Sequence, residues 1–236
     1  MSHKTFFLVL VVLCIVSLFT YQGKTYADET ALTPRKAAQQ LADHLRELDS
    51  LSFSFTQETQ GQMSGRPRQA SGRAFFAKQD GTALMRWDYD TPDRQVILSD
   101  GTTLTMYFSS LNQMIIAPAE KLQQDVTYSF FSGSGNIDDT FIIQGEEEAG
   151  RYDGNHLNSP IQLIPRAPNA QTQSIKLWFS DSNQIHTLEI RDNFDTITRL
   201  SLNNIEENSL TVEGKLLDET LFQFTPPPDT EILNQE

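Results

Sequence analysis

Apolar and polar side chains alternate with a period of two along much of the chain after residue 50. Met85, Trp87 and Tyr89 alternate with charged residues, and Leu104 and Met106 alternate with threonines. A period of two places one set of side chains on a buried face and the other toward solvent. The pattern therefore predicts amphipathic β-strands.

About eleven such short strands follow one another, with almost no helix between them. Asp100-Gly101 separates two of them, and Asp-Gly between apolar runs is a strong hairpin signal. The last strands are expected at 210–216 and 222–225, before Pro226-Pro227-Pro228 ends the sheet. The pattern predicts a mainly β protein with a single antiparallel sheet, curled on itself and apolar on one face.

One helix is expected before the sheet. Thr33-Pro34 supplies a capping side chain and a proline for the first turn. Ala37, Leu41, Leu45 and Leu48 then recur at spacings of three or four, which forms one apolar stripe along a helix. We expect this helix to lie across the sheet.

The first 27 residues have the features of a signal peptide. Lys4 gives a positive start, and the apolar run from Phe6 to Phe19 is short for a membrane span. Thr25-Tyr26-Ala27 resembles a small-x-small cleavage site, so cleavage is expected there. The domain would then be 28–236, and a retained N-terminal anchor is the alternative.

Cysteine and charge restrict the function further. Cys14 is the single cysteine, and the bulky Leu13 before it argues against a lipoprotein signal. The chain after residue 27 therefore lacks disulfides and thiol chemistry. Removing Lys4 and Lys24 lowers the basic residues from 18 to 16 against 31 acidic ones, a net charge of −15. Such a charge repels nucleic acid and anionic membrane surfaces, so no nucleic-acid partner is expected.

Motifs for catalysis are scarce. His44, His156 and His186 lack metalloprotease spacing, and there is no nucleophile elbow. Asp138-Asp139 is expected to be a solvated turn, because calcium loops need a defined ligand spacing that is absent here. A carboxylate pair for glycoside chemistry is compatible with the sequence, but nothing singles one out. We expect neither an enzyme nor a bound cofactor or metal.

The apolar face of the predicted sheet contains rings and methionines rather than compact branched side chains. It can be plain core or the wall of a cavity, since Met and aromatic residues form adaptable apolar walls. The candidate cavity residues are Phe53, Phe55, Met85, Trp87, Tyr89, Leu104, Met106, Phe108, Phe130, Phe131, Leu177 and Phe179. Leu41, Leu45 and Leu48 of the helix are the candidate lid residues, with the insert at 118–135.

Three stretches resemble a known family. They are Arg86-Trp87-Asp88-Tyr89 followed by Pro92, Gln95, Ser99-Asp100-Gly101, Leu104 and Tyr107, then Phe55-Thr56-Gln57, and finally Phe222-Gln223-Phe224-Thr225-Pro226-Pro227. The first resembles the central signature of the outer-membrane lipoprotein carrier proteins, the LolA family. The others resemble its first strand and its C-terminal end, in the right order.

The resemblance implies an unclosed half-barrel with helices as a lid. The apolar cavity between them would hold the acyl chains of a lipoprotein while it crosses the periplasm. The implied partners are acylated lipoproteins, an inner-membrane ABC transporter that loads the carrier and an outer-membrane acceptor that unloads it. We expect a periplasmic monomer.

One departure from the family concerns the lid. Many members have Lys-Arg-Pro after the second strand, and the arginine is thought to hold the lid. Here the matching stretch is Lys78-Gln79-Asp80-Gly81, and Gln79 has no charge and no forked donor. Either the latch is weaker or another residue holds the lid. A module of the same fold that senses lipoproteins or lipids is the alternative function, followed by an envelope hydrolase.

Overall fold

The computed structural model describes residues 33–61, 65–124, 130–131, 136–145, 160–167 and 172–235. They belong to one compact unit, Leu32–Glu236. The predicted signal peptide, 1–27, lies outside the described residues. Within the described ranges, no helix has both the length and the apolar character needed to cross a membrane.

A sheet of twelve strands dominates, in the order β14-β6-β5-β4-β3-β2-β1-β11-β10-β9-β8-β7. Two antiparallel meanders, β1 to β6 and β7 to β11, meet where β1 pairs with β11. The strands are β1 Ser50–Gln60, β2 Arg68–Gln79, β3 Thr82–Thr91, β4 Gln95–Ser99, β5 Thr103–Phe108, β6 Gln113–Pro118, β7 Phe141–Gly145, β8 Ile161–Pro165, β9 Ser174–Phe179, β10 Ile185–Arg191, β11 Ile197–Glu207 and β14 Glu231–Asn234.

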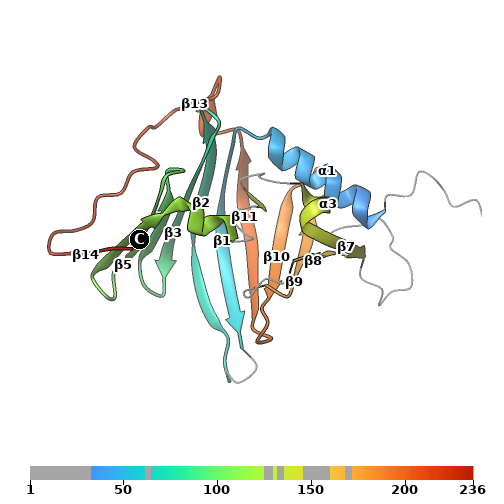
Figure 1. Cartoon of the computed structure of the whole chain (residues 1–236), viewed down its shortest axis with the longest axis horizontal. Helices are drawn as coiled ribbons and strands as arrows, with labels where there is room; N and C mark the ends of the chain where they lie inside the picture. Colours follow the sequence, from blue (N-terminus) through green and yellow to red (C-terminus); the bar gives the residue numbers. More distant parts are fainter. Residues whose placement is uncertain are drawn as a thin grey trace, which may run out of the picture. The chain divides into compact units, whose positions relative to one another are not determined.

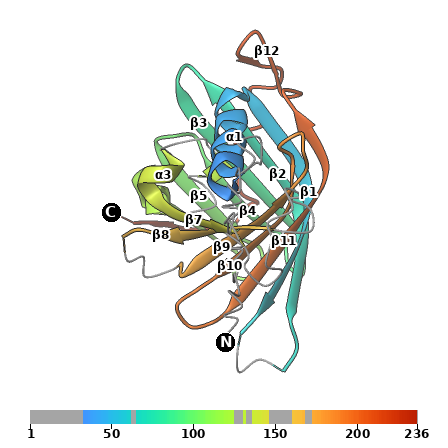
Figure 2. The same cartoon turned by 90° about the vertical axis from the view of Figure 1, so that its right-hand side faces the viewer.

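The sheet is curved, and its two edges, β14 and β7, do not pair with each other (Figure 1). Figure 2 shows the helix α1, Pro34–Glu47, lying across the hollow side of the curve. The predicted mainly β, unclosed architecture is confirmed. One pairing differs from the antiparallel expectation, because β14 runs parallel to β6 after a long connection rather than a hairpin.

The helix α1 forms as its sequence predicts. The Thr33 hydroxyl accepts a hydrogen bond from the Lys36 backbone N–H at 3.2 Å, which satisfies one of the free donors of the first turn. Its apolar stripe is buried against the sheet, with Leu41 fully buried and Leu45 5% exposed. The described residues between β6 and β7 include the short helices η1 (Ala119–Gln124) and the unexpected α3 (Ile137–Thr140), while 125–129 and 132–135 of the predicted lid insert lie outside the described residues.

The strand β2 begins at Arg68 and ends at Gln79. A bulge against β3 lies at Ser71-Gly72, and a Cβ on Gly72 would stand only 1.9 Å from the Asp88 carbonyl oxygen. Glycine is therefore required there for the close approach of the two backbones. The adjacent rings of β2 lie on opposite faces, because Phe76 is buried on the concave face while Phe75 packs on the convex one.

The C-terminal part differs most from the sequence prediction. Residues 210–216 form a separate small hairpin, β12 (Thr211–Val212) with β13 (Lys215–Leu216), instead of one strand of the sheet. Residues 222–225 are not a strand at all. Phe222 and Phe224 instead pack into two small apolar clusters on the convex face, and the chain continues past the prolines to β14. Alternation alone does not distinguish a strand of the sheet from a segment lying across it, because both can bury every second side chain.

Candidate functional site

Five aromatic rings meet on the concave face, and we call Phe53, Phe55, Phe76, Trp87 and Phe131 the inner aromatic cluster. Phe55 lies 4.9 Å from Trp87 between ring centres, and Phe131 lies 5.1 Å from Phe76. Edge-to-face and tilted contacts at these distances are favourable for aromatic pairs. All five rings are at least 94% buried.

The structure brings nearly all predicted cavity residues together. The main apolar cluster contains or contacts Phe53, Phe55, Met85, Trp87, Tyr89, Leu104, Met106, Phe130, Phe131, Leu177 and Phe179, with the lid residues Leu41, Leu45 and Leu48. The exception is Phe108, which is half-buried on β5 and is not part of the cluster. It lies opposite Gln95 and Gln113, near the polar end of the strands, where the cluster has ended.

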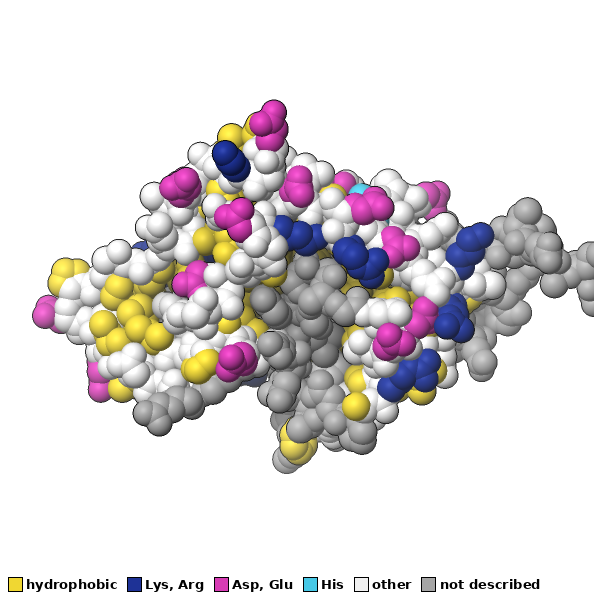
Figure 3. Space-filling model, turned by 45° about the horizontal axis from the view of Figure 1, so that its top comes forward, with side chains coloured by type: hydrophobic (Ala, Val, Ile, Leu, Met, Phe, Trp, Pro, Cys, Tyr) yellow, Lys and Arg dark blue, Asp and Glu magenta, His cyan; other side chains and the backbone are white. Residues whose placement is uncertain are grey.

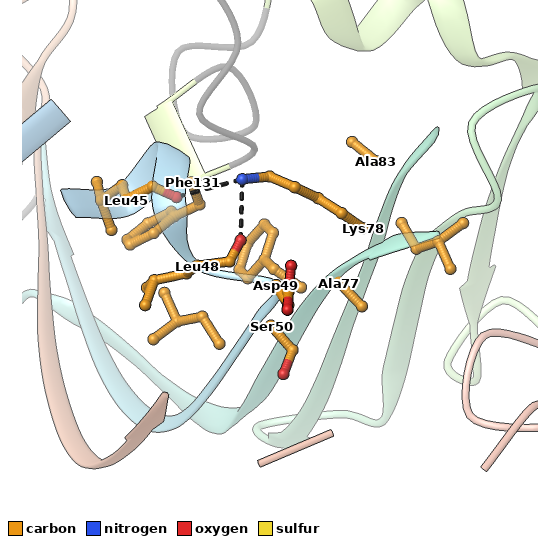
Figure 4. A pocket seen from close by; sticks show the side chains of 11 residues that line it. Leu45, Leu48, Asp49, Ser50, Ala77, Lys78, Ala83 and Phe131 are labelled. Atoms are coloured by element: carbon orange, nitrogen blue, oxygen red, sulfur yellow. Dashed lines mark hydrogen bonds between the residues drawn. The ribbon is translucent and has the colours of Figure 1, made fainter. Parts of the chain in front are cut away.

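The C-terminal end of α1 is held by Lys78 from β2. Its ammonium donates to the carbonyl oxygens of Arg46 at 2.5 Å and Leu48 at 2.9 Å, and reaches that of Leu45 at 3.5 Å. Figure 4 shows Lys78 extended across the pocket toward Leu45 and Leu48. A cation at a helix C-terminus pairs with unsatisfied carbonyls and with the negative end of the helix dipole. Lys78, not Gln79, is therefore the residue that contacts the lid from this strand.

Burial lowers the pKa of the Lys78 ammonium below its ordinary value, while the Asp49 carboxylate opposes that shift and Arg46 adds to it. The ammonium is thus partly desolvated, and three carbonyl oxygens replace the lost water. Desolvation strengthens such hydrogen bonds relative to those of an exposed lysine.

The other parts of α1 are held by polar contacts as well. The Asp138 carboxylate on α3 accepts from Arg35 at 2.7 Å and from Gln39 at 2.5 Å. These hydrogen bonds, the one from Gln39 first, lower the pKa of Asp138. In the last turn of the helix, His44 lies 3.2 Å from the Glu207 carboxylate at the end of β11. The predicted solvated turn at Asp138 is therefore partly wrong, because one of its carboxylates anchors the helix.

Among the described residues, little empty space lies between α1 and the sheet. Two cavities there have volumes of about 10 Å³ each, and both are lined by Leu45, Leu51 and Phe131. A cavity of this size holds at most about one water molecule, whereas ligand pockets have volumes of about 300–1,000 Å³. In this structure α1 lies closed on the concave face, and the inner aromatic cluster fills the space beneath it.

The outer half of the signature motif has a different role. Arg86 forms an ion pair with Asp88 at 3.0 Å and donates to the carbonyl oxygens of Leu221 at 2.7 Å and Gln223 at 3.2 Å. Arg86 is thus one of the charged residues that the alternation in this strand directs away from the buried face, and Asp88 is its carboxylate partner. These contacts fix the C-terminal segment to the convex side of β3.

Sequence reasoning missed Lys78, Asp138 and Glu207 as lid contacts. Their partners lie 30 to 163 positions away in the chain, so no local pattern indicates them. The described ranges also contain no group of three or more histidine, cysteine or acidic side chains placed to hold a metal.

An unclosed sheet whose apolar hollow is covered by a helix held through polar contacts defines a sheet-and-lid protein. The sequence profile of the outer membrane lipoprotein carrier protein LolA matches residues 46–225, and the chain belongs to this family. An outer-membrane lipoprotein carrier protein from Methylococcus capsulatus is 29% identical over 89% of this chain and 92% of its own length. One from Francisella tularensis subsp. novicida is 24% identical over 95% and 97%.

Solved structures share the fold. An uncharacterised conserved protein from Thermus thermophilus superposes with a TM-score of 0.50 over 84% of this chain and 99% of its own. Sequence identity in that pair is 12%, so the similarity concerns the architecture alone.

Proposed function

We propose that this protein binds the acyl chains of lipoproteins released from the inner membrane and carries them through the periplasm to the outer membrane. It acts as a binding protein, not as an enzyme. An inner-membrane ABC transporter loads it and an outer-membrane acceptor unloads it. Residues 1–27 are removed as a signal peptide, and the mature chain is a monomer.

The observation that carries this proposal is the apolar concave face under a helix that has polar contacts at both ends. Acyl chains need shielding from water, since each buried CH₂ contributes about 0.8 kcal/mol. The polar contacts of α1 are exchangeable, because water or a partner protein can replace hydrogen bonds at modest net cost. A cover held in this way can shield the ligand and still release it.

Binding requires the lid to open. The two cavities of about 10 Å³ are far too small for an acyl chain, so α1 and Phe131 must move away from the sheet. The apolar contacts that α1 loses are then replaced by contacts with the acyl chains. Loading is therefore an exchange of one apolar partner for another, with little net exposure of apolar surface to water.

The copurifying ligand tests the proposal directly. Native mass spectrometry of the protein isolated from its own cell envelope should show adducts with the mass of triacylated or diacylated proteins. Free lipid alone would indicate a lipid-sensing module of the same fold. No adduct, together with turnover of an envelope substrate, would indicate a hydrolase, and either result would reject the carrier function.

A further inference from the structure

A row of apolar side chains crosses the sheet from the inner aromatic cluster to the free edge of β14. Each of its members lies directly opposite the next in the strand register, so all point to the concave side. We call these residues the apolar row: Trp87, Ile97, Met106, Ile115 and Leu233.

Exposure rises along the apolar row. Trp87 is 6% exposed, the next three side chains are half-buried, and Leu233 is 37% exposed. Figure 3 shows hydrophobic side chains gathered on the side of the molecule where Figure 1 places β14. The row therefore connects the closed cluster with solvent at an edge of the sheet.

Two neighbouring rows on the same face border it. On one side the register places a row of four buried residues, Met85, Ser99, Leu104 and Ala117. On the other side lies a row that is mostly polar, Tyr89, Gln95, Phe108, Gln113 and Glu231. The partly exposed apolar strip between them is one side chain wide, and none of its five members is charged.

The strip has the length of one acyl chain. It spans four steps between strands of about 4.8 Å each, or about 19 Å. The hydrocarbon core of a bilayer is about 30 Å thick, so one acyl chain in a leaflet extends over about 15 Å.

We propose that the apolar row is the seat of one acyl chain of the cargo. The methyl end of the chain lies at Trp87, and the carbonyl end leaves the sheet at Leu233, where the polar lipoprotein continues into solvent. This inference rests on the proposed carrier function and assigns β14 to the binding site. It also gives a reason for the single parallel strand, which extends the row to the edge.

The affinity for a palmitoylated peptide tests the position of the chain. Leu233→Asp should weaken binding about tenfold, the loss expected when one apolar contact becomes charged. Ile232→Asp is the matched control, since Ile232 is the adjacent residue on β14 and is 50% exposed on the convex face. On β6, Ile115→Asp should weaken binding in the same way, and Ile116→Asp is its matched control.

The direction of the chain is tested by fluorescence. In a Trp178→Phe background, Trp87 is the only tryptophan. Bromines near the methyl end of the palmitoyl chain should quench it, and bromines near the carbonyl should not.

The outcomes separate the two proposals. If the unaltered protein does not bind the palmitoylated peptide, the carrier function is rejected. If it binds but Leu233→Asp behaves like Ile232→Asp, or the methyl-end bromines leave Trp87 unquenched, the apolar row is not the seat and the carrier function stands. If Ile115→Asp fails to fold, the comparison of Leu233→Asp with Ile232→Asp still tests the apolar row, because Leu233 lies at an exposed edge of the sheet.

Discussion

The two faces of β3 are covered in different ways. On the concave face, Trp87 packs under a helix that contacts the sheet with apolar side chains and is held by Lys78 and Asp138. On the convex face, Arg86 clamps the main chain of the C-terminal segment in its middle, and Phe222 is inserted beside it. Both covers bury apolar side chains; α1 is held in addition by Lys78 and Asp138, and the C-terminal segment by the hydrogen bonds that its carbonyl oxygens accept from Arg86.

The length of α1 adds to this difference. It has 14 residues, and an isolated helix of that length is marginal in water. When α1 lifts from the sheet, it needs a new apolar partner to remain helical. In the proposed carrier function, a cargo acyl chain supplies such a partner, and so does the surface of another protein. The proposed carrier function therefore requires the concave cover to open, whereas it requires no movement of the convex one.

The largest expected effect is the loss of a ring from the concave side. Phe55→Ala should lower the free energy of unfolding by about 3–5 kcal/mol, because Phe55 is 2% exposed and packs between two rings. Denaturant unfolding measures this change. Phe194→Ala is the control, since Phe194 is 80% exposed and should change stability by less than about 0.5 kcal/mol. A small effect for Phe55→Ala would mean that the concave face is loosely packed.

The second largest effect is expected for the contacts of Arg86 on the convex face. Arg86→Met leaves the Asp88 carboxylate and two backbone carbonyls without their partner, and should cost about 1.5–3 kcal/mol of global stability. Hydrogen exchange in α1 should not change beyond that global loss, because the clamp acts on the opposite face. Selective loss of protection in α1 would show that the two covers are coupled.

A smaller and more local effect is expected at the lid. Lys78→Met should increase hydrogen exchange in the last turn of α1, with about 1 kcal/mol lost from local protection and little change in global unfolding. Lys78→Arg should preserve most of the protection, since it keeps the charge and the donors. Lys215→Met, on the exposed hairpin β12–β13, is the neutral control. Unchanged exchange in Lys78→Met would show that Lys78 does not hold the helix.

The smallest effect concerns acid pH. The hydrogen bonds from Gln39 and Arg35 lower the pKa of Asp138 in the folded protein, so their contribution is present above the unfolded pKa of about 3.9. It is lost as the pH falls through the lowered folded value. Protection in the first turns of α1, measured against the intrinsic exchange rate at each pH, should therefore decrease at acid pH, and the contribution should be below about 1 kcal/mol because Arg35 is largely exposed.

The Asp138→Asn variant tests whether Asp138 is the group whose titration causes the acid dependence. The variant should show increased exchange at neutral pH and should have lost most of the acid dependence, since the amide does not titrate in this range. An unaltered acid dependence in Asp138→Asn would place the titrating group elsewhere.

The sequence determined the elements whose signals are local. The cap at Thr33, the apolar stripe of α1 and the alternation in β1 to β6 all depend on residues within a few positions of each other, so helix and strand periods are readable directly. The family signature was readable in the same way, and so was the outward placement of Arg86. These features suffice for a single mainly β sheet with an apolar face and one helix over it.

The tertiary structure decided which of these elements meet. A period of two does not distinguish a strand from a segment lying across a sheet, which is why residues 222–225 were assigned wrongly. The parallel pairing of β14, the contacts of Lys78 and Asp138 with α1, and the register that aligns the apolar row join residues far apart in the chain. Whether the concave face is a filled core or an open cavity also depends on gaps between side chains of different strands, and here Phe131 and the neighbouring rings fill them.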